Sequence, residues 1–283
     1  NIKTLSILIV LLLIISFTKK ESFADGYMNE ASGGILNKDK TSPFKKNKDL
    51  SRCLKFAVAM EFIHTSSILL DDLPSMDNDI LRRNQEAFHV KYSVLNTQII
   101  TGLLINLSIK LVYDNFIEIG LENKLDIIIQ NICKNVGILG AAGGQLLDLT
   151  PFNEFDRTKL NTKQNIEKLH NMKTTSFFEM AFLGSYLLNY DGEEKDTITE
   201  ASFYFGLCFQ IYDDFDDIEQ DKKRTDDNLF DPNYINNFGK KNATAEFHNN
   251  MNQFINKMKH MDLFTNQIQE ICFMLIQKIK HYY

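Results

Sequence analysis

Proline and glycine are scarce along the whole chain, and this scarcity is the strongest constraint on its fold. The 283 residues include only 4 prolines and 13 glycines, fewer than average usage would give. Both residue types interrupt helices, so their scarcity leaves room for long uninterrupted helices. A hydrophobic content of 44% also supplies enough apolar side chains for a substantial core. The sequence therefore predicts an all-α fold.

The apolar residues follow a helical period from Ser51 onward, recurring at steps of three and four. The first helix runs into Asp71 and ends at Pro74, and a second is expected to begin near Asp77 or Asn78, where the side chain caps well. Strand signals are weak throughout. Further helices are predicted over residues 94–117, 122–149, 163–189, 195–220, 241–258 and 262–281.

The first 50 residues differ from the rest. Residues 5–17, LSILIVLLLIISF, are apolar apart from two serines. This stretch is shorter than the ~20 residues of a membrane-spanning helix, and its length suits the core of a signal peptide. We expect a targeting or membrane-anchoring segment over residues 1–24, with a buried first helix as the alternative. Residues 25–50 are polar and predict a linker, and residues 51–283 form the main domain.

The expected location follows from that segment: an endomembrane or organelle, with the cytoplasm second. Charge and cysteine usage exclude other classes. A net charge of −6 and a pI near 5.6 argue against a nucleic-acid partner, because phosphate binding needs clustered basic residues. Four scattered cysteines without a C-x-x-C pair argue against a disulfide framework or a zinc site. They are Cys53, Cys133, Cys208 and Cys272.

Two acidic clusters each follow an apolar helical stretch. The first, HTSSILLDDLPSMDNDILRR over residues 64–83, holds Asp71, Asp72, Asp77 and Asp79 just before Arg82 and Arg83. In the second, FQIYDDFDDIEQD over residues 209–221, the spacing places Asp213, Asp214 and Asp217 on one helix face. Like charges at roughly 5 Å repel by about 3 kcal/mol per pair before screening. A partly buried face of this kind therefore needs a positive partner.

An isolated acidic run is most often a solvated surface. Two such runs at the ends of apolar helices, one followed directly by arginines, instead favour a binding site. Mg²⁺ takes oxygen ligands and binds through one or two carboxylates together with substrate phosphates. A guanidinium group is a strong bidentate partner for phosphate oxygens. The two clusters could thus face each other in a helical bundle and hold a phosphorylated ligand through several metal ions.

Four motifs in order resemble those of the trans-prenyl diphosphate synthases, the short-chain polyprenyl synthetases that make farnesyl and geranylgeranyl diphosphate. They are DDLPSMD with the following LRR, GGQLLDL at residues 143–149, the pair Lys173–Thr174, and FQIYDDFDD at residues 209–217. The resemblance covers roughly residues 51–221. It implies the isoprenoid synthase fold, a bundle of about ten or more helices around a central cavity, and a homodimer.

The resemblance also implies roles for individual residues. The metal ligands would be Asp71, Asp72, Asp77, Asp213, Asp214 and Asp217, with about three Mg²⁺ ions per site. Arg82 and Lys173 would hold the allylic diphosphate, and Arg83 and His64 would contact isopentenyl diphosphate. Lys222 and Lys223 would serve as lid lysines. Thr174 and Gln210 would lie beside the allylic cation, so that Lys173, Thr174 and Gln210 form the catalytic set.

The implied reaction is loss of diphosphate from an allylic substrate, attack by the double bond of isopentenyl diphosphate, and proton loss. In this family the product tail grows beneath the first acidic motif, and large side chains four or five residues before its first aspartate block it. Ser67 and Ser66 occupy these positions and are small. Geranylgeranyl diphosphate is therefore the expected product, with farnesyl diphosphate second.

The chain departs from the family pattern upstream. Gly33–Gly34 are not followed by the lysine and arginine that the family's GGKxxR segment supplies to isopentenyl diphosphate, and Lys38 is the candidate replacement. Two alternatives therefore stay open. One is a catalytically impaired subunit that regulates an active homologue in a heteromer. The other is a terpene cyclase, against which the sequence DDFDD argues, because such cyclases carry a different second motif.

Overall fold

The computed structural model describes residues 51–82, 84–149, 162–216 and 233–282. The targeting segment and the linker that the sequence predicts fall on residues 1–50 and lie outside the described residues. Four of the predicted site residues also lie outside them: Arg83, Asp217, Lys222 and Lys223.

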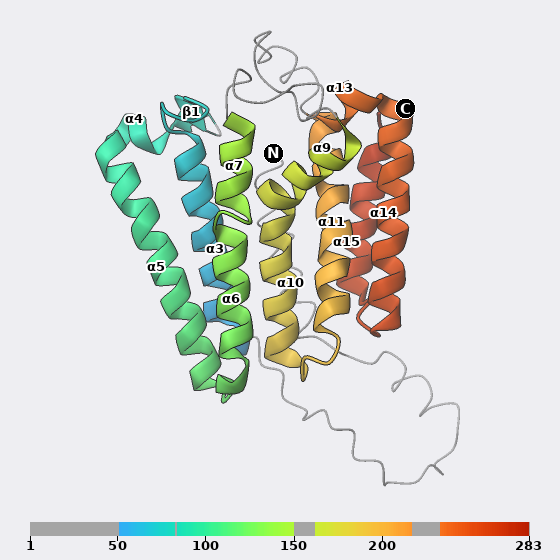
Figure 1. Cartoon of the computed structure of the whole chain (residues 1–283), viewed down its shortest axis with the longest axis horizontal. Helices are drawn as coiled ribbons and strands as arrows, with labels where there is room; N and C mark the ends of the chain where they lie inside the picture. Colours follow the sequence, from blue (N-terminus) through green and yellow to red (C-terminus); the bar gives the residue numbers. More distant parts are fainter. Residues whose placement is uncertain (1–50, 83, 150–161, 217–232, 283) are drawn as a thin grey trace.

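Long helices side by side build the described part of the chain (Figure 1). They are α3 (Ser51–Asp71), α5 (Val94–Glu118), α6 (Leu125–Val136), α7 (Ala141–Leu149), α10 (Ser176–Asn189), α11 (Lys195–Asp216), α14 (Lys240–His260) and α15 (Asn266–Lys280). Shorter helices are α4 (Phe88–Tyr92), η1 (Glu122–Lys124), α9 (Lys163–His170) and α13 (Tyr234–Phe238). The all-α prediction is confirmed, and the helices expected over residues 94–117 and 241–258 match α5 and α14.

The helix expected to begin near Asp77 is wrong. Turns follow α3, and a small antiparallel hairpin then pairs β1 (Leu81–Arg82) with β2 (Gln85–Glu86). Asn78 and Asn84 adopt left-handed backbone conformations, with φ of 53° and 62°, which asparagine tolerates better than most residues. Tight turns at these two positions end helical propagation and fold the chain back over the end of α3.

The helix predicted over residues 122–149 is divided. It begins with the 3₁₀ turn η1, continues as α6, bends over residues 137–140 and resumes as α7. At the bend Gly137 caps α6 in an extended conformation, with φ −80° and ψ −161°. A Cβ on Gly143 would collide with the backbone carbonyl of Ile138, so the bend is tight enough to require glycine there.

The segment predicted as one helix over residues 163–189 is helical throughout but not uniform. Between α9 and α10 lies one turn of π-helix, η3 (Asn171–Thr175), which contains Lys173 and Thr174. Single π turns inside α-helices occur frequently at functional sites. The turn packs against α7 on one side and α11 on the other.

Aromatic side chains from three helices form the centre of the core. Phe178 and Phe182 of α10, Phe205 of α11 and Phe254 of α14 are almost fully buried, and their ring centroids lie 5.0–5.8 Å apart in edge-on or tilted pairs. Such geometries are the favoured ones for aromatic pairs. Because α10 is buried along nearly its whole length, it fixes the spacing of the helices that carry the two acidic clusters.

The pair α3 and α5 is held by buried polar contacts. The Ser66 hydroxyl donates to the backbone carbonyl of Thr101 at 3.1 Å. Asn115 of α5 accepts from the backbone N–H of Phe56 at 2.9 Å and donates to the carbonyl of Arg52 at 2.6 Å. Buried hydrogen bonds of this kind are costly to leave unmade, so they fix the register of α3 against α5.

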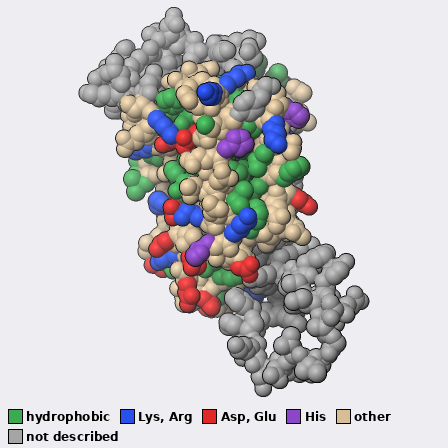
Figure 2. All heavy atoms as spheres, turned by 90° about the vertical axis from the view of Figure 1, so that its right-hand side faces the viewer, with side chains coloured by type: hydrophobic (Ala, Val, Ile, Leu, Met, Phe, Trp, Pro, Cys, Tyr) green, Lys and Arg blue, Asp and Glu red, His purple; other side chains and the backbone are tan. Residues whose placement is uncertain are grey.

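The two sides of the bundle differ in polarity. On the side of α14, charged groups of both signs lie among uncharged ones (Figure 2). On the other side, α5 is long and apolar enough to cross a membrane by length and composition alone, and only 17% of its most apolar window is buried. The segments Arg52–Asp71 and Glu122–Leu149 meet the same two criteria. The exposed apolar residues there define an apolar face: Leu95, Ile99, Leu103, Leu107, Ile138, Leu139, Leu146 and Leu147.

Candidate active site

Both acidic clusters lie at one end of the bundle. Helix α3 ends at Asp71 and leads into the hairpin β1–β2, while α11 ends at Asp216 close to α13, and these elements share the upper end in Figure 1. The C-terminus of a helix has a partial negative charge. Two helix C-termini with aspartates therefore create a strongly electronegative end, which favours cations.

The first cluster is divided by burial. Asp72 is 2% exposed and accepts hydrogen bonds from the Arg82 guanidinium, from Nε at 2.8 Å and from Nη2. Asp71 is partly exposed and Asp77 is exposed. Burial lowers the pKa of Arg82, but its hydrogen bond with Asp72 and the neighbouring aspartates outweigh this effect, so the pKa is raised. Arg82, the predicted diphosphate ligand, is thus held against Asp72.

Lys173 links the π turn to the first cluster. Its ammonium group forms an ion pair with Asp148 of α7. Burial lowers the pKa of Lys173, but attraction by Asp148, Asp71 and Asp77 outweighs this effect, so the pKa is raised above its ordinary value. Asp148 belongs to the GGQLLDL motif that the sequence singles out, although the sequence assigned it no role. The only charged residue of that motif is this aspartate, and that was the signal in the sequence that could have identified it as a site residue.

Thr174 links the same turn to the second cluster. Its hydroxyl donates to Oε1 of Gln210 at 2.5 Å, and Nε2 of Gln210 donates to Oδ1 of Asp214 at 2.8 Å. The other carboxylate oxygen of Asp214 accepts from the backbone N–H of Tyr234 at 2.7 Å. Asp214 is 5% exposed, so it orients Gln210 from within the core. Asp213 beside it is partly exposed.

The described residues suit Mg²⁺ only in combination with a phosphorylated ligand. Among them, His, Cys, Asp and Glu side chains form no group of three or more that could hold a metal ion unaided. Mg²⁺ is rarely held in an all-protein cage and usually takes one or two carboxylates together with substrate phosphates. The partly exposed Asp71 and Asp213, together with the exposed Asp77, fit that pattern.

The remaining predicted residues lie along α3. The ring of His64 meets the ring of Phe177 from α10 edge-on, with centroids 6.0 Å apart. Ser67 lies one turn further along the same face of α3 and is partly exposed. Ser66 is 1% exposed and bonds to α5. The two serines that the sequence treats together therefore have different surroundings.

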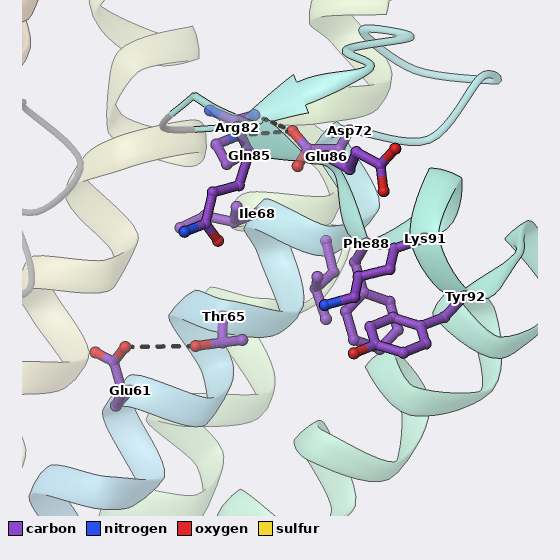
Figure 3. Close-up of a pocket in the computed structure, with 11 residues that line it drawn as sticks. Glu61, Thr65, Ile68, Asp72, Arg82, Gln85, Glu86, Phe88, Lys91 and Tyr92 are labelled. Atoms are coloured by element: carbon purple, nitrogen blue, oxygen red, sulfur yellow. Dashed lines mark hydrogen bonds and ion pairs between the residues drawn. The ribbon is translucent and has the colours of Figure 1, made fainter.

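A pocket of about 520 Å³ opens on a third face of α3 (Figure 3). Glu61 and Thr65 line it from α3, and Phe88, Lys91 and Tyr92 line it from α4. Its residues on α3 lie on a different face from His64, Ser67 and Asp71. The pocket meets the acidic site only through the pair Asp72–Arg82, so it is adjacent to the site rather than the site itself.

Comparison with known proteins identifies the family. A family model described as polyprenyl synthetase matches residues 30–234, which is more than half of the chain. The chain belongs to the polyprenyl synthetase family. The resemblance to trans-prenyl diphosphate synthases is thereby confirmed.

Two curated relatives are named for different products. Farnesyl diphosphate synthase of Bacillus subtilis is 29% identical over 168 residues, covering 59% of this chain and 55% of the relative. Geranylgeranyl diphosphate synthase of Cyanophora paradoxa is 30% identical over 171 residues, covering 60% and 55%. The chain therefore spans about half the length of the curated relatives it matches.

Solved structures confirm the isoprenoid synthase fold. A geranyltransferase from Helicobacter pylori, complexed with magnesium and isoprenyl diphosphate, superimposes with a TM-score of 0.66 at 22% identity, covering 96% of this chain and 83% of the other. At this level of identity the likeness concerns the fold.

We expect Arg82→Met to lower the free energy of unfolding by about 3 kcal/mol, because it leaves the buried Asp72 carboxylate without its partner. Adding Asp72→Asn should restore more than half of the loss, since a neutral amide is cheaper to bury than an unpaired charge. Urea unfolding of the wild type, the single variant and the double variant measures both effects. Equal stability of the single and double variants would contradict the assignment.

Proposed function

We propose that this polyprenyl synthetase is a prenyltransferase that condenses isopentenyl diphosphate with an allylic diphosphate in a Mg²⁺-dependent reaction. The observation that supports it most is the π turn between the two acidic clusters. On one side of the turn, Lys173 is attracted by Asp71 and Asp77. On the other side, Thr174 reaches Asp214 through Gln210. A diphosphate bound between the clusters would meet carboxylate-held metal on two sides and an ammonium group in the middle.

The residues that would hold Mg²⁺ are Asp71 and Asp77 on the side of α3 and Asp213 on the side of α11, with Asp217 expected to join them. When bound, Mg²⁺ supplies positive charge that stabilises the departing diphosphate. Lys173 adds a fixed positive charge at the same place. Asp72 and Asp214 are buried and already hydrogen-bonded. We therefore propose that Asp72 orients Arg82 and that Asp214 orients Gln210.

The oxygen atoms of Thr174 and Gln210 would lie beside the developing allylic cation, where oriented dipoles stabilise positive charge without rearrangement. The Thr174 hydroxyl donates its proton to Gln210, which leaves its lone pairs available to the cation. Phe177 of α10 lies about one helical turn after Thr174, and its ring meets that of His64. It would help to exclude water, which would otherwise capture the cation. His64 would face isopentenyl diphosphate together with Arg83.

The proposed product is geranylgeranyl diphosphate. The side chains of Ser66 and Ser67 are too small to block the growing product tail beneath the first cluster. Ser67 shares a face of α3 with His64, which meets α10, whereas Ser66 is sealed against α5. The geometry therefore favours Ser67 as the residue beside the growing isoprenoid tail.

The proposed assembly is a homodimer formed through the apolar face. Leu95, Ile99, Leu103 and Leu107 recur every four residues along α5 and are 47–65% exposed. A row of this spacing is a ridge that packs into the groove of another helix. In a two-fold dimer the same patch meets itself, and such interfaces are more apolar than ordinary surface. A second copy of the chain would cover the apolar residues of α5 and α7 together.

Turnover tests the proposed activity. The purified full chain, given Mg²⁺, isopentenyl diphosphate and either dimethylallyl or farnesyl diphosphate, should form a longer prenyl diphosphate, and a chelator should abolish this. Asp71→Ala and Asp213→Ala should each lower kcat on the order of 10²-fold or more, because charge on the leaving diphosphate is no longer neutralised. Asp196→Ala, an exposed aspartate at the other end of α11, is the matched control and should keep full activity.

The outcome also separates the alternatives. No turnover by the chain alone, with turnover restored by an active homologous subunit, would replace the proposal by the regulatory subunit. Release of diphosphate and formation of a cyclic hydrocarbon without isopentenyl diphosphate would indicate a terpene cyclase.

Product length has its own test. Ser67→Phe should shift the product from twenty toward fifteen carbons, because an aromatic ring would block the region beneath the first cluster. Ser66→Ala removes one buried hydrogen bond without adding bulk, so it is the control and should leave chain length unchanged. Chromatography of the dephosphorylated products measures both. An unaltered distribution from active Ser67→Phe would place the floor elsewhere.

The mass in solution tests the homodimer. Sedimentation of the wild type should give twice the chain mass, and Leu103→Lys with Leu107→Lys should give a monomer, because two charges would have to be desolvated in the interface. Phe273→Lys replaces an apolar residue on α15 that is more exposed than Leu103 or Leu107, and this variant should remain dimeric. A monomeric wild type would exclude the dimer. If that monomer bound lipid vesicles and the Leu103→Lys, Leu107→Lys variant did not, the apolar face would be assigned to a membrane.

A further inference from the structure

The π turn Asn171–Thr175 lies in a narrow space between α7 and α11. Thr175 is 1% exposed, and the turn packs against both helices. In each of them a glycine lies directly against the turn, with no room for a Cβ atom. The two contacts follow the same pattern on opposite sides.

On the side of α7, the glycine is Gly144. A Cβ built on it would lie 2.7 Å from the backbone nitrogen of Lys173 and 3.0 Å from its Cα. Real Cβ atoms do not approach backbone this closely. One helical turn further along α7, Asp148 forms the ion pair with the Lys173 side chain. The same face of α7 thus admits the backbone of Lys173 and binds its ammonium group.

On the side of α11, the glycine is Gly206. A Cβ built on it would lie 2.5 Å from Oγ1 of Thr175 and 2.8 Å from both its Cβ and its Cγ2. One helical turn further along α11, Gln210 accepts the hydrogen bond from Thr174 at 2.5 Å. Each flanking helix therefore presents a glycine against the turn and, four residues later, a polar partner for one of its functional side chains.

We propose that Gly144 and Gly206 are positioning residues that set how closely the π turn seats between α7 and α11, and thereby place Lys173 and Thr174 for catalysis. The inference rests on the proposed prenyltransferase function for its catalytic consequence. Its structural part, the seating of the turn, stands apart from that function.

The two glycines act from opposite sides, so the turn cannot move away from one helix without approaching the other. A methyl group on Gly206 would push Thr175 toward α7, where Gly144 already admits the backbone of Lys173 without spare room. Any compensating shift must lengthen the hydrogen bond from Thr174 to Gln210. Displacement of about 1 Å in a catalytic arrangement can cost about 10²-fold in rate.

The two contacts differ in one respect that makes the proposal testable. Gly206 meets a side chain, which can be trimmed, whereas Gly144 meets the backbone, which cannot. Thr175→Gly should therefore remove the steric clash that Gly206→Ala creates, because the Thr175 side chain is absent in the double variant. We call this double variant, Gly206→Ala with Thr175→Gly, the Gly206 exchange. The same Thr175→Gly change should give no relief to Gly144→Ala.

The experiment compares five proteins: wild type, Gly206→Ala, Gly206→Ala with Thr175→Gly, Gly144→Ala, and Gly144→Ala with Thr175→Gly. In Gly206→Ala we expect kcat to fall on the order of 10- to 100-fold, with the KM for isopentenyl diphosphate changed by less than about threefold, because the turn contacts the allylic side of the site. The Gly206 exchange should regain at least about a third of wild-type kcat, and Gly144→Ala with Thr175→Gly should not.

Gly102→Ala controls for the general effect of alanine in a helix, because nothing lies within 4 Å of a Cβ built there. Its free energy of unfolding should equal or slightly exceed that of the wild type. Should Gly206→Ala fail to fold, Gly206→Ala with Thr175→Ala keeps a single close contact and supplies a milder displacement for the same measurements. Unchanged kcat in a folded Gly206→Ala variant, or equal rescue at both glycines, would overturn the proposal.

A crystal structure of each variant separates failure of this inference from failure of the proposed function. In Gly206→Ala the hydrogen bond between Thr174 and Gln210 should be broken, and in the Gly206 exchange it should be restored. If Gly206→Ala does not fold, Gly206→Ala with Thr175→Ala takes its place. Both expectations hold whether or not the chain turns over substrate. An intact bond in Gly206→Ala, or in the variant that takes its place, would overturn the seating of the turn. If the wild type showed no turnover but the hydrogen bond between Thr174 and Gln210 changed as expected in the variants, only the proposed function would be contradicted.

Discussion

The close seating of one π turn between two helices is the constraint on which the arrangement of the site depends. The acidic clusters are far apart in the sequence and lie on α3 and α11, which α10 separates. The turn at the start of α10 spans this distance, with Lys173 directed to the first cluster and Thr174 to the second. A π turn spaces successive side chains differently around the helix axis from an α-helical turn, so it sets the directions in which Lys173 and Thr174 leave the helix.

The two aspartates of each adjacent pair, Asp71–Asp72 and Asp213–Asp214, differ in burial and therefore in role. Asp72 and Asp214 are buried, and each is neutralised or hydrogen-bonded by a fixed partner, Arg82 for one and Gln210 with a backbone N–H for the other. Asp71 and Asp213 are the partly exposed members. Two adjacent carboxylates repel each other. In each pair the buried carboxylate is held by partners within the protein, and the other one faces the solvent, where a cation can reach it.

The sequence predicted those features of the fold that depend on local spacing. Helical periodicity identified α5 and α14 closely, and the linear motifs named Lys173, Thr174 and Gln210, which the structure brings together with the acidic clusters. Neither the bend over residues 137–140 nor the π turn could be predicted in this way. The π turn depends on close contacts with helices distant in the sequence, and the bend depends on a close approach of Gly143 to the backbone of Ile138. The role of Gly143 or of Gly206 is therefore visible only once its neighbour in space is known.

The same helical period explains why neighbouring residues of α3 differ in role. Successive residues are about 100° apart around a helix, so Ser66 faces α5 while Ser67 shares a face with His64. A third face, with Asp72, meets Arg82. Counting residues back from the acidic motif, which is all that a sequence permits, does not separate the two serines. Their contacts do, because Ser66 is buried against α5, where a bulky side chain would strain the helix pair, whereas Ser67 is partly exposed.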